Sequence, residues 1–244
     1  MGMTGNRIGF TSGMIMLSAA LALTADGVET SLNAGLTLTD GNSRTRQAAV
    51  AVTTEGERER LGSFRAGAAV NYGESKIDGE RETTLDNAKL FGNVRKTITP
   101  RTYGALDASA LYDDIALIDY RVIVGPSLGA YLVKTDDTAL SFDLGLAYLW
   151  EDVDAVRDDY LAARLAQRLE HALSETAKAW QSAEYIPKAD NFNDYLLSAE
   201  VGAEAAMNTR LSLRVVLQSQ YDATPAAGLK RTDVSLISGL RIAL

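Results

Sequence analysis

The strongest constraint on the fold is an alternation of apolar with small or polar residues that has a period of two. In the segment 139–150, ALSFDLGLAYLW, the even positions from Leu140 to Trp150 are all apolar or aromatic, and the odd positions up to 147 are small or polar. The segment 211–221 alternates in a similar way. Successive side chains of a strand point to opposite faces, so this pattern predicts strands with one apolar and one polar face.

Turn-forming residues divide the chain after residue 26 into twelve such runs. A membrane strand needs about ten residues and single-chain bacterial barrels have an even number of strands. We therefore predict an all-β fold, a transmembrane up-and-down antiparallel β-barrel of about twelve strands. Ten or fourteen strands stay open, because the stretches near 113–118 and 174–190 are ambiguous. The predicted strands lie at roughly 28–39, 44–54, 60–72, 83–96, 101–112, 119–133, 138–150, 158–172, 177–186, 193–207, 210–221 and 231–244.

Composition removes several classes of function. The net charge of −8 argues against nucleic acid as a partner, because proteins that bind it present a basic face. The chain has no cysteine, which excludes disulfides, thiolate metal sites and a lipoprotein anchor, and it has a single histidine. We therefore predict no enzyme activity, no cofactor and no metal site.

Residues 1–25 differ from the rest of the chain. Arg7 is followed by an uncharged, largely apolar stretch, and small residues offer cleavage after Ala22 or Ala25. A basic start, a short apolar core and small residues describe a secretory signal peptide, and the core is shorter than the roughly 20 residues of a spanning helix. We predict a cleaved signal peptide at 1–25 and an outer-membrane barrel at 26–244, in a Gram-negative-type bacterium.

The connections between the predicted strands are unequal. Those after odd-numbered strands, such as GESKIDGERE at 73–82, are long and mostly acidic or rich in turn residues, and those after even-numbered strands, such as KTDD at 134–137, are short. The tight turn at 40–43 is the exception. Outer-membrane barrels have short periplasmic turns and longer extracellular loops, so the pattern predicts that both termini are periplasmic.

Aromatic residues gather near the long connections, as expected of rings that lie at the level of the lipid headgroups. Tyr103, Tyr131 and Trp180 lie nearer the short turns, and we predict that they belong to a second belt at the other interface. The aromatic residues beside the long connections are Tyr72, Tyr112, Tyr120, Tyr148, Trp150, Tyr160, Tyr185, Tyr195 and Tyr221.

The competing fold is a secreted β-sandwich, whose outer face would be rich in Lys, Glu and Thr. Here the polar face is mostly Gly, Ala, Ser and Asn with scattered charges of both signs, which favours the enclosed lumen of a barrel whose apolar face contacts lipid. The charged residues that we predict to line the lumen are Arg65, Lys89, Asp107, Arg121, Asp143, Arg164, Arg168, Glu200, Glu204, Arg214 and Arg241.

The segment 156–180 is ambiguous. It is rich in helix formers, and Tyr160, Leu161, Leu165 and Leu169 would share one stripe of a helix. As a strand it would place these leucines toward lipid. An uninterrupted meander of strands favours the strand interpretation, and the helix stays open.

Three short motifs stand out from the strand pattern. They are Gly41-Asn42-Ser43, Glu184-Tyr185-Ile186-Pro187 and the set Gln218, Tyr221, Asp222 and Pro225. In these motifs, and over essentially the whole mature chain, the sequence resembles the salt-induced outer-membrane proteins of domain-of-unknown-function family 481. The resemblance implies an outer-membrane β-barrel and a link to salt or osmotic stress, and it brings no established activity, ligand or catalytic residue. Members of the family typically end on an aromatic residue, and Leu244 departs from that pattern.

The last residues, SGLRIAL, alternate to the end of the chain, although chain ends usually fray. We predict that this segment is the closing strand, paired with the strand at 28–39, because closure leaves no free edge. Gly239, Leu240, Ile242 and Leu244 resemble the C-terminal signal that the barrel-assembly machinery recognises.

Catalysis and metal binding have weak support. His171 is the only candidate base, and Ser174 lies beyond the end of its strand. The acidic connections could bind Ca²⁺ or Mg²⁺, but none has the spacing typical of a calcium loop, so we interpret them as solvated charge. Loose bridging to lipopolysaccharide phosphates through divalent cations is a separate interpretation that stays open.

The predicted function is an outer-membrane protein of the cell envelope that forms a narrow channel for small solutes or ions. Its partners are outer-membrane lipid, lipopolysaccharide and the barrel-assembly machinery. Lumen charges can select ions, but they can also pair and fill a narrow barrel. The alternative function is therefore a non-conducting structural or assembly-partner barrel.

Overall fold

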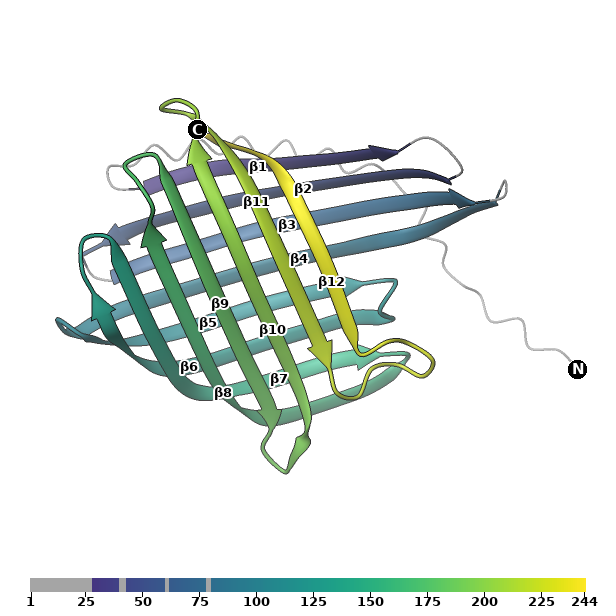
Figure 1. The fold of residues 1–244 in the computed structure, drawn as a ribbon. Coiled ribbons are helices and arrows are strands. Elements are labelled where there is room, and N and C mark those ends of the chain that lie inside the picture. The colour runs from purple at the N-terminus through teal and green to yellow at the C-terminus, as the bar shows by residue number, and fades with distance from the viewer. Residues whose placement is uncertain (1–27, 40–42, 60–61, 78–79) are drawn as a thin grey trace, which may run out of the picture.

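The chain forms a closed antiparallel barrel in which every strand pairs with its neighbours in sequence and β1 pairs with β12 (Figure 1). The predicted fold and the count of twelve strands are confirmed. This computed structural model describes residues 28–39, 43–59, 62–77 and 80–244. The strands are β1 Val28–Thr39, β2 Ser43–Arg58, β3 Gly62–Ile77, β4 Glu80–Thr99, β5 Thr102–Asp113, β6 Ile118–Lys134, β7 Thr138–Val153, β8 Val156–Ala172, β9 Ala177–Lys188, β10 Asn191–Ala206, β11 Leu211–Asp222 and β12 Thr232–Ala243.

The alternation in sequence becomes an apolar outer surface and a mixed inner one. On β7, Leu144 exposes 64% of its surface, whereas its neighbour Asp143 exposes 6%. On β12 the outward Leu236 is also largely exposed, and Arg241 points inward toward carboxylates of other strands. Leucines on the outside and charged groups on the inside are the opposite of the distribution in a soluble protein. This arrangement suits a barrel surrounded by lipid.

The prediction of long connections after odd-numbered strands is wrong for most of them. The residues of GESKIDGERE are mainly the ends of β3 and β4, which continue to Ile77 and from Glu80. Strands β7 and β8 are joined by Asp154 and Ala155, whose φ angles of 51° and 60° form the tight turn that matches strand twist. Many of the acidic residues, such as Glu74, Glu80, Glu151 and Asp158, therefore lie on strand extensions, and Asp114, Asp154 and Asp190 lie in the short connections.

The longest connection is that between β11 and β12 at 223–231. We name the end of the barrel that has this connection the outer end. The opposite end, which has the turns at 135–137 and 173–176, is the inner end. The predicted signal peptide at 1–25 and most of the predicted turn at 40–43 lie outside the described residues.

The ambiguous segment 156–180 is strand. β8 pairs with β7 along its whole length, from Val156 opposite Val153 to His171 opposite Thr138. Its outward residues include Leu161 and Leu165, both 46% exposed. Among the described residues, no helix is long and apolar enough to cross a membrane.

The seam between β1 and β12 is the shortest pairing of the barrel. Ser31–Ala34 pair with Leu240–Ala243, whereas β1 pairs with β2 along twelve residues. A Cβ at Gly239 would lie 2.3 Å from the backbone oxygen of Ala34, so a larger residue does not fit where the two strands meet. The expected contact between the end of the chain and its first strand is present, and recognition of this segment by the assembly machinery stays a prediction.

Candidate functional site

The inward faces of β6–β10 form one side of the lumen, which we name the packed wall. Ala147, Leu149, Ala162 and Ile186 are buried there and contact one another. Ile123, Tyr160 and Leu196 pack against this cluster. Apolar side chains therefore fill the space beside these strands, where the sequence predicted a polar lumen.

The inward faces of β2–β4 form the open wall. Their inward positions include Ala49 and Ala51 on β2 and Ala69 on β3, all partly exposed, and Lys89 on β4, which is exposed. Small side chains therefore leave accessible space at these inward positions, in contrast to the packed wall.

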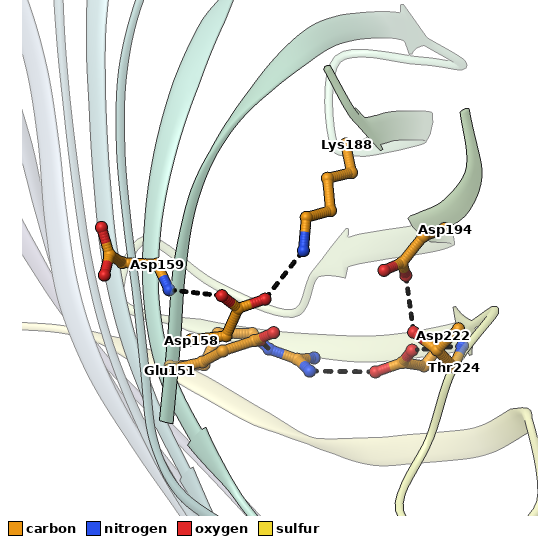
Figure 2. Close-up of polar contacts among 8 residues, drawn as sticks. Glu151, Asp158, Asp159, Lys188, Asp194, Asp222 and Thr224 are labelled. Carbon is orange, nitrogen blue, oxygen red and sulfur yellow. Dashed lines mark hydrogen bonds and ion pairs between the residues drawn. The ribbon is translucent and has the colours of Figure 1, made fainter. Parts of the chain in front are cut away.

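A bridge of charges crosses the lumen at the outer end. Arg121 on β6 donates to Glu151 on β7 at 2.5 Å and to Asp222 on β11 at 2.9 Å. Strands β6 and β11 are not neighbours, so this ion pair connects opposite parts of the barrel. Figure 2 shows Glu151 and Asp222 at this bridge. Only 10% of the Arg121 side chain is exposed.

The rim around this bridge is also polar (Figure 2). Lys188 on β9 lies 2.7 Å from Asp158 on β8, and the Thr224 hydroxyl donates to Asp194 at 2.5 Å. Lys188 lowers the pKa of Asp158, mainly through this hydrogen bond. Several acidic residues of the outer end are thus held by partners of the same rim.

A second bridge lies near the middle of the strands. Arg164 on β8 donates to Glu184 on β9 at 2.6 Å and to Asp107 on β5 at 3.0 Å. Asn93 on β4 donates to Asp107 at 2.7 Å. The Arg164 side chain is 11% exposed, so its charge is largely buried and matched by two carboxylates.

The inner end has arginines in two different situations. Arg241 is paired, with Glu29 at 2.5 Å and Glu204 at 3.3 Å. Arg65 has its nearest carboxylate, Glu55, at 3.7 Å, and its Nε is buried without a hydrogen-bond partner among the described residues. Arg168 is paired with Glu170 on its own strand.

Aromatic rings support the arginines that lack close carboxylates. Arg214 lies 4.6 Å from the centroid of the Trp180 ring, and Arg95 lies 5.0 Å from that of Tyr103. Tyr103 and Trp180 expose only 3% and 6% of their surfaces. The prediction that these two residues form an inner belt toward lipid is therefore wrong, since they face the lumen. Tyr160 also packs inside, in the packed wall.

The remaining predicted lumen residues are dispersed. Asp143 accepts a hydrogen bond from the Tyr103 hydroxyl at 3.0 Å. Glu200 accepts from Trp180 Nε1 at 2.5 Å and from Gln218 at 2.8 Å. The structure thus brings the predicted charges into separate outer, middle and inner groups, and their role in conduction stays a prediction.

Residues that the sequence prediction omitted complete these groups. Arg95 is an even number of positions from the predicted Lys89 on β4, and Tyr103 is an even number from the predicted Asp107 on β5. Residues with this spacing lie on the same face of a strand, so the spacing could have identified both as lumen residues. The other omitted partners are Glu29, Glu55, Glu151, Glu170, Trp180, Glu184 and Asp222.

The candidate catalytic residues have ordinary structural partners. His171 Nδ1 lies 2.8 Å from the Thr138 hydroxyl, and the Ser174 hydroxyl accepts hydrogen bonds from the backbone N–H groups of Thr176 and Ala177 in the turn. Among the described residues, no group of three or more His, Asp or Glu side chains could hold a metal ion.

A family model described as "Protein of unknown function, DUF481" matches residues 32–243. Comparison with curated proteins gave no match. The chain is similar to the NanC porin, with a TM-score of 0.54 and 6% identity, over 88% of this chain and 100% of that chain. Such low identity shows the fold alone, which is that of outer-membrane porins.

Two further structures match with lower scores. One is the KdgM porin in complex with disordered oligogalacturonate, with a TM-score of 0.47 and 7% identity over 89% of this chain and 99% of that one. The other is the translocator domain of the autotransporter NalP from Neisseria meningitidis, with a TM-score of 0.43 and 14% identity over 91% and 90%.

Proposed function

The chain belongs to the DUF481 family, and we propose that it forms a narrow passage for small solutes and ions across the outer membrane of a Gram-negative bacterium. The passage runs along the open wall of the lumen. Twelve strands give a bore wider than that of an eight-stranded barrel, which side chains fill, and narrower than that of the large porins.

One observation carries this proposal. Arg65 and Glu55 face inward, and 37% and 43% of their side chains are exposed. Because these side chains point inward, their exposure supports accessible space in the lumen beside them, at the inner end of the open wall. Charged groups along such a space let ions enter and can select among them.

Planar-bilayer recording tests the passage directly. We expect the purified, refolded protein to give discrete current steps in salt solution. The absence of current at every salt concentration and voltage would end the proposal.

Cysteine labelling tests the position of the passage, because the chain has no cysteine of its own. We expect a bulky cationic thiol reagent to lower the conductance of an Ala69→Cys variant, because Ala69 lies on the open wall. The matched control is Ala162→Cys on the packed wall, where the residue is fully buried and the reagent should have no effect. Equal responses of the two variants would contradict this position.

A non-conducting structural barrel is the second candidate. The bridge from Arg121 to Asp222 crosses the outer end, and the apolar cluster fills the lumen next to it. This function predicts no current together with a loss of envelope integrity when the gene is deleted, measured as sensitivity to detergent.

We also propose that the protein acts under salt or osmotic stress, which rests on the resemblance of the sequence to salt-induced outer-membrane proteins. Lipid, lipopolysaccharide and the assembly machinery are the partners that this proposal implies. Comparison of growth and transcript level in low and high NaCl tests it, and no change in either would contradict it.

A further inference from the structure

Two arginines in the inner half of the lumen have guanidinium groups that carboxylates do not satisfy. Arg65 on β3 has a buried Nε without a hydrogen-bond partner, and its nearest carboxylate is 3.7 Å away. Arg214 on β11 stacks on Trp180 and has no ion pair within the described part of the chain. Buried donors in folded proteins are nearly always bonded, so an unbonded one points to a missing partner.

Contacts at the inner end connect the surroundings of the two guanidinium groups. Glu55 lies 3.7 Å from Arg65 and 3.8 Å from Arg241. Arg241 also lies 3.3 Å from Glu204, which is opposite Arg214 in the pairing of β10 with β11. Strands β3 and β11 are not neighbours in the barrel, so these contacts pass through the lumen and not along the sheet. A negative group placed between Arg65 and Arg214 would be attracted by both.

The protein's own carboxylates near this position already have other partners. Glu200 accepts hydrogen bonds from Trp180 and Gln218, and Glu204, opposite Arg214, is paired with Arg241. Glu170 is held by Arg168. The free N–H edges of the two guanidinium groups are therefore available to an external acceptor.

Ring stacking also fixes the orientation of these groups. Arg214 lies over Trp180, and Arg65 lies 5.8 Å from the centroid of the Phe91 ring. A Cβ at Gly202 would lie 2.1 Å from the Trp180 ring, so the absence of a side chain at Gly202 gives this ring its place. A stacked guanidinium keeps its edge free and presents parallel N–H groups that match the oxygens of a carboxylate or phosphate.

We propose that Arg65 and Arg214 together bind an oxyanion, the carboxylate or phosphate of a small solute, in the inner half of the lumen. This site deepens the proposed passage by naming its solute class. Its role in transport rests on that function, whereas binding itself does not require conduction.

The test uses Trp180 as a reporter. The chain has two tryptophans, and Trp150 is on the outer surface, 42% exposed, so a Trp150→Phe variant leaves Trp180 as the single fluorophore. The refolded barrel in detergent is titrated with sodium gluconate and with sodium phosphate. Sorbitol is the uncharged match for gluconate, and NaCl at equal ionic strength controls for salt. We expect a saturable change in Trp180 emission with the two oxyanions and none with sorbitol or NaCl.

Variants in the same background locate the binding. Arg65→Gln should weaken gluconate and phosphate binding by about tenfold or more, the effect of losing hydrogen bonds from a charged donor. Arg65→Lys keeps the positive charge but lacks the planar guanidinium, so its affinity for the oxyanions should lie between those of the parent and Arg65→Gln. If Arg65→Gln fails to fold, the comparison of Arg65→Lys with the parent still tests the site. Arg157→Gln at the outer rim, where the side chain is 80% exposed, is the control and should bind as the parent does.

Either of two results would overturn the site: no saturable response to both oxyanions, or identical curves for the parent and Arg65→Gln. Oxyanion binding without any current in bilayers would support the site and contradict the proposed passage. Current without oxyanion binding would support the passage and contradict the site.

Discussion

The open wall and the packed wall come from strands with similar alternation, but their inward residues differ in size and polarity. On β2 and β3 the inward positions include Ala51 and Ala69, which are partly exposed. On β7 and β8 they include Leu149 and Ala162, which are fully buried. A barrel of this size can thus keep space on one side while apolar packing stabilises the other.

The charges follow the same division. Arg164 extends from the packed wall and is matched by two carboxylates, whereas Arg65 on the open wall has none within hydrogen-bond distance. Buried arginines generally stabilise a structure only with good partners, and a poorly paired one is usually kept for another reason. The difference is that Arg164 is held by close carboxylates within the packed wall, whereas Arg65 is only loosely paired with Glu55 and keeps donors for the oxyanion that we propose.

The largest expected effect is a difference in the free energy of unfolding between variants of Arg164 and Arg65. Arg164→Gln leaves Asp107 and Glu184 without their cation in a largely buried place, and breaking such a pair costs about 3–5 kcal/mol. Arg65→Gln removes one partner of a loose, partly exposed ion pair and should change the free energy of unfolding by less than about 1 kcal/mol. Urea unfolding followed by tryptophan emission and by the heat-modifiable mobility on gels measures both. Equal losses would show that the two walls do not differ in this respect.

A matched pair of enlargements tests the packing itself. Ala162→Leu forces a larger side chain into a filled cluster and should destabilise the barrel by about 1–3 kcal/mol. Ala69→Leu places the same side chain in open space, so its unfolding free energy should stay within about 0.5 kcal/mol of the parent, as for surface substitutions. In bilayers we expect Ala69→Leu to lower the conductance. A stable Ala162→Leu barrel with an unstable Ala69→Leu barrel would reverse the assignment of the walls.

Much of the architecture was predictable because the alternation repeats in every strand. Leu144 and Leu236 gave the outer face, and the run to Leu244 gave the closing strand. The two-residue turn at Asp154 and Ala155 was not predictable from acidity alone, since acidic residues also continue a strand beyond the membrane. Strand extensions and loops have similar composition outside the lipid.

The lumen was harder to predict, because its contacts join strands that are distant in sequence. Parity places Arg121 and Asp222 on the inward face, but it does not tell that the two meet across the outer end. Trp180 was assigned to a belt by its position near a turn, although it faces inward and stacks with Arg214. Side-chain reach across a barrel depends on its cross-section, which strand patterns do not contain.

The smallest expected effect concerns an ion pair at the rim of the packed wall. Lys188 lies 2.7 Å from Asp158, and 50% of the Asp158 side chain is exposed, so solvent screens the pair and its contribution is below about 1 kcal/mol. Lys188 lowers the pKa of Asp158 below its ordinary value of 3.8. A carboxyl with a lowered pKa stabilises the folded state at neutral pH, and this contribution disappears as the pH falls through the lowered value.

Asp158→Asn should therefore unfold at slightly lower urea concentration than the parent at pH 7, and the difference should disappear as the pH falls through the lowered pKa of Asp158, because both side chains are then uncharged. Added salt should shrink the difference at pH 7, because the pair is exposed. A loss of unfolding free energy at pH 7 as large as that of Arg164→Gln would contradict this expectation. It would mean that the contribution of an ion pair depends on its position in the packed wall and not on the burial of its charges.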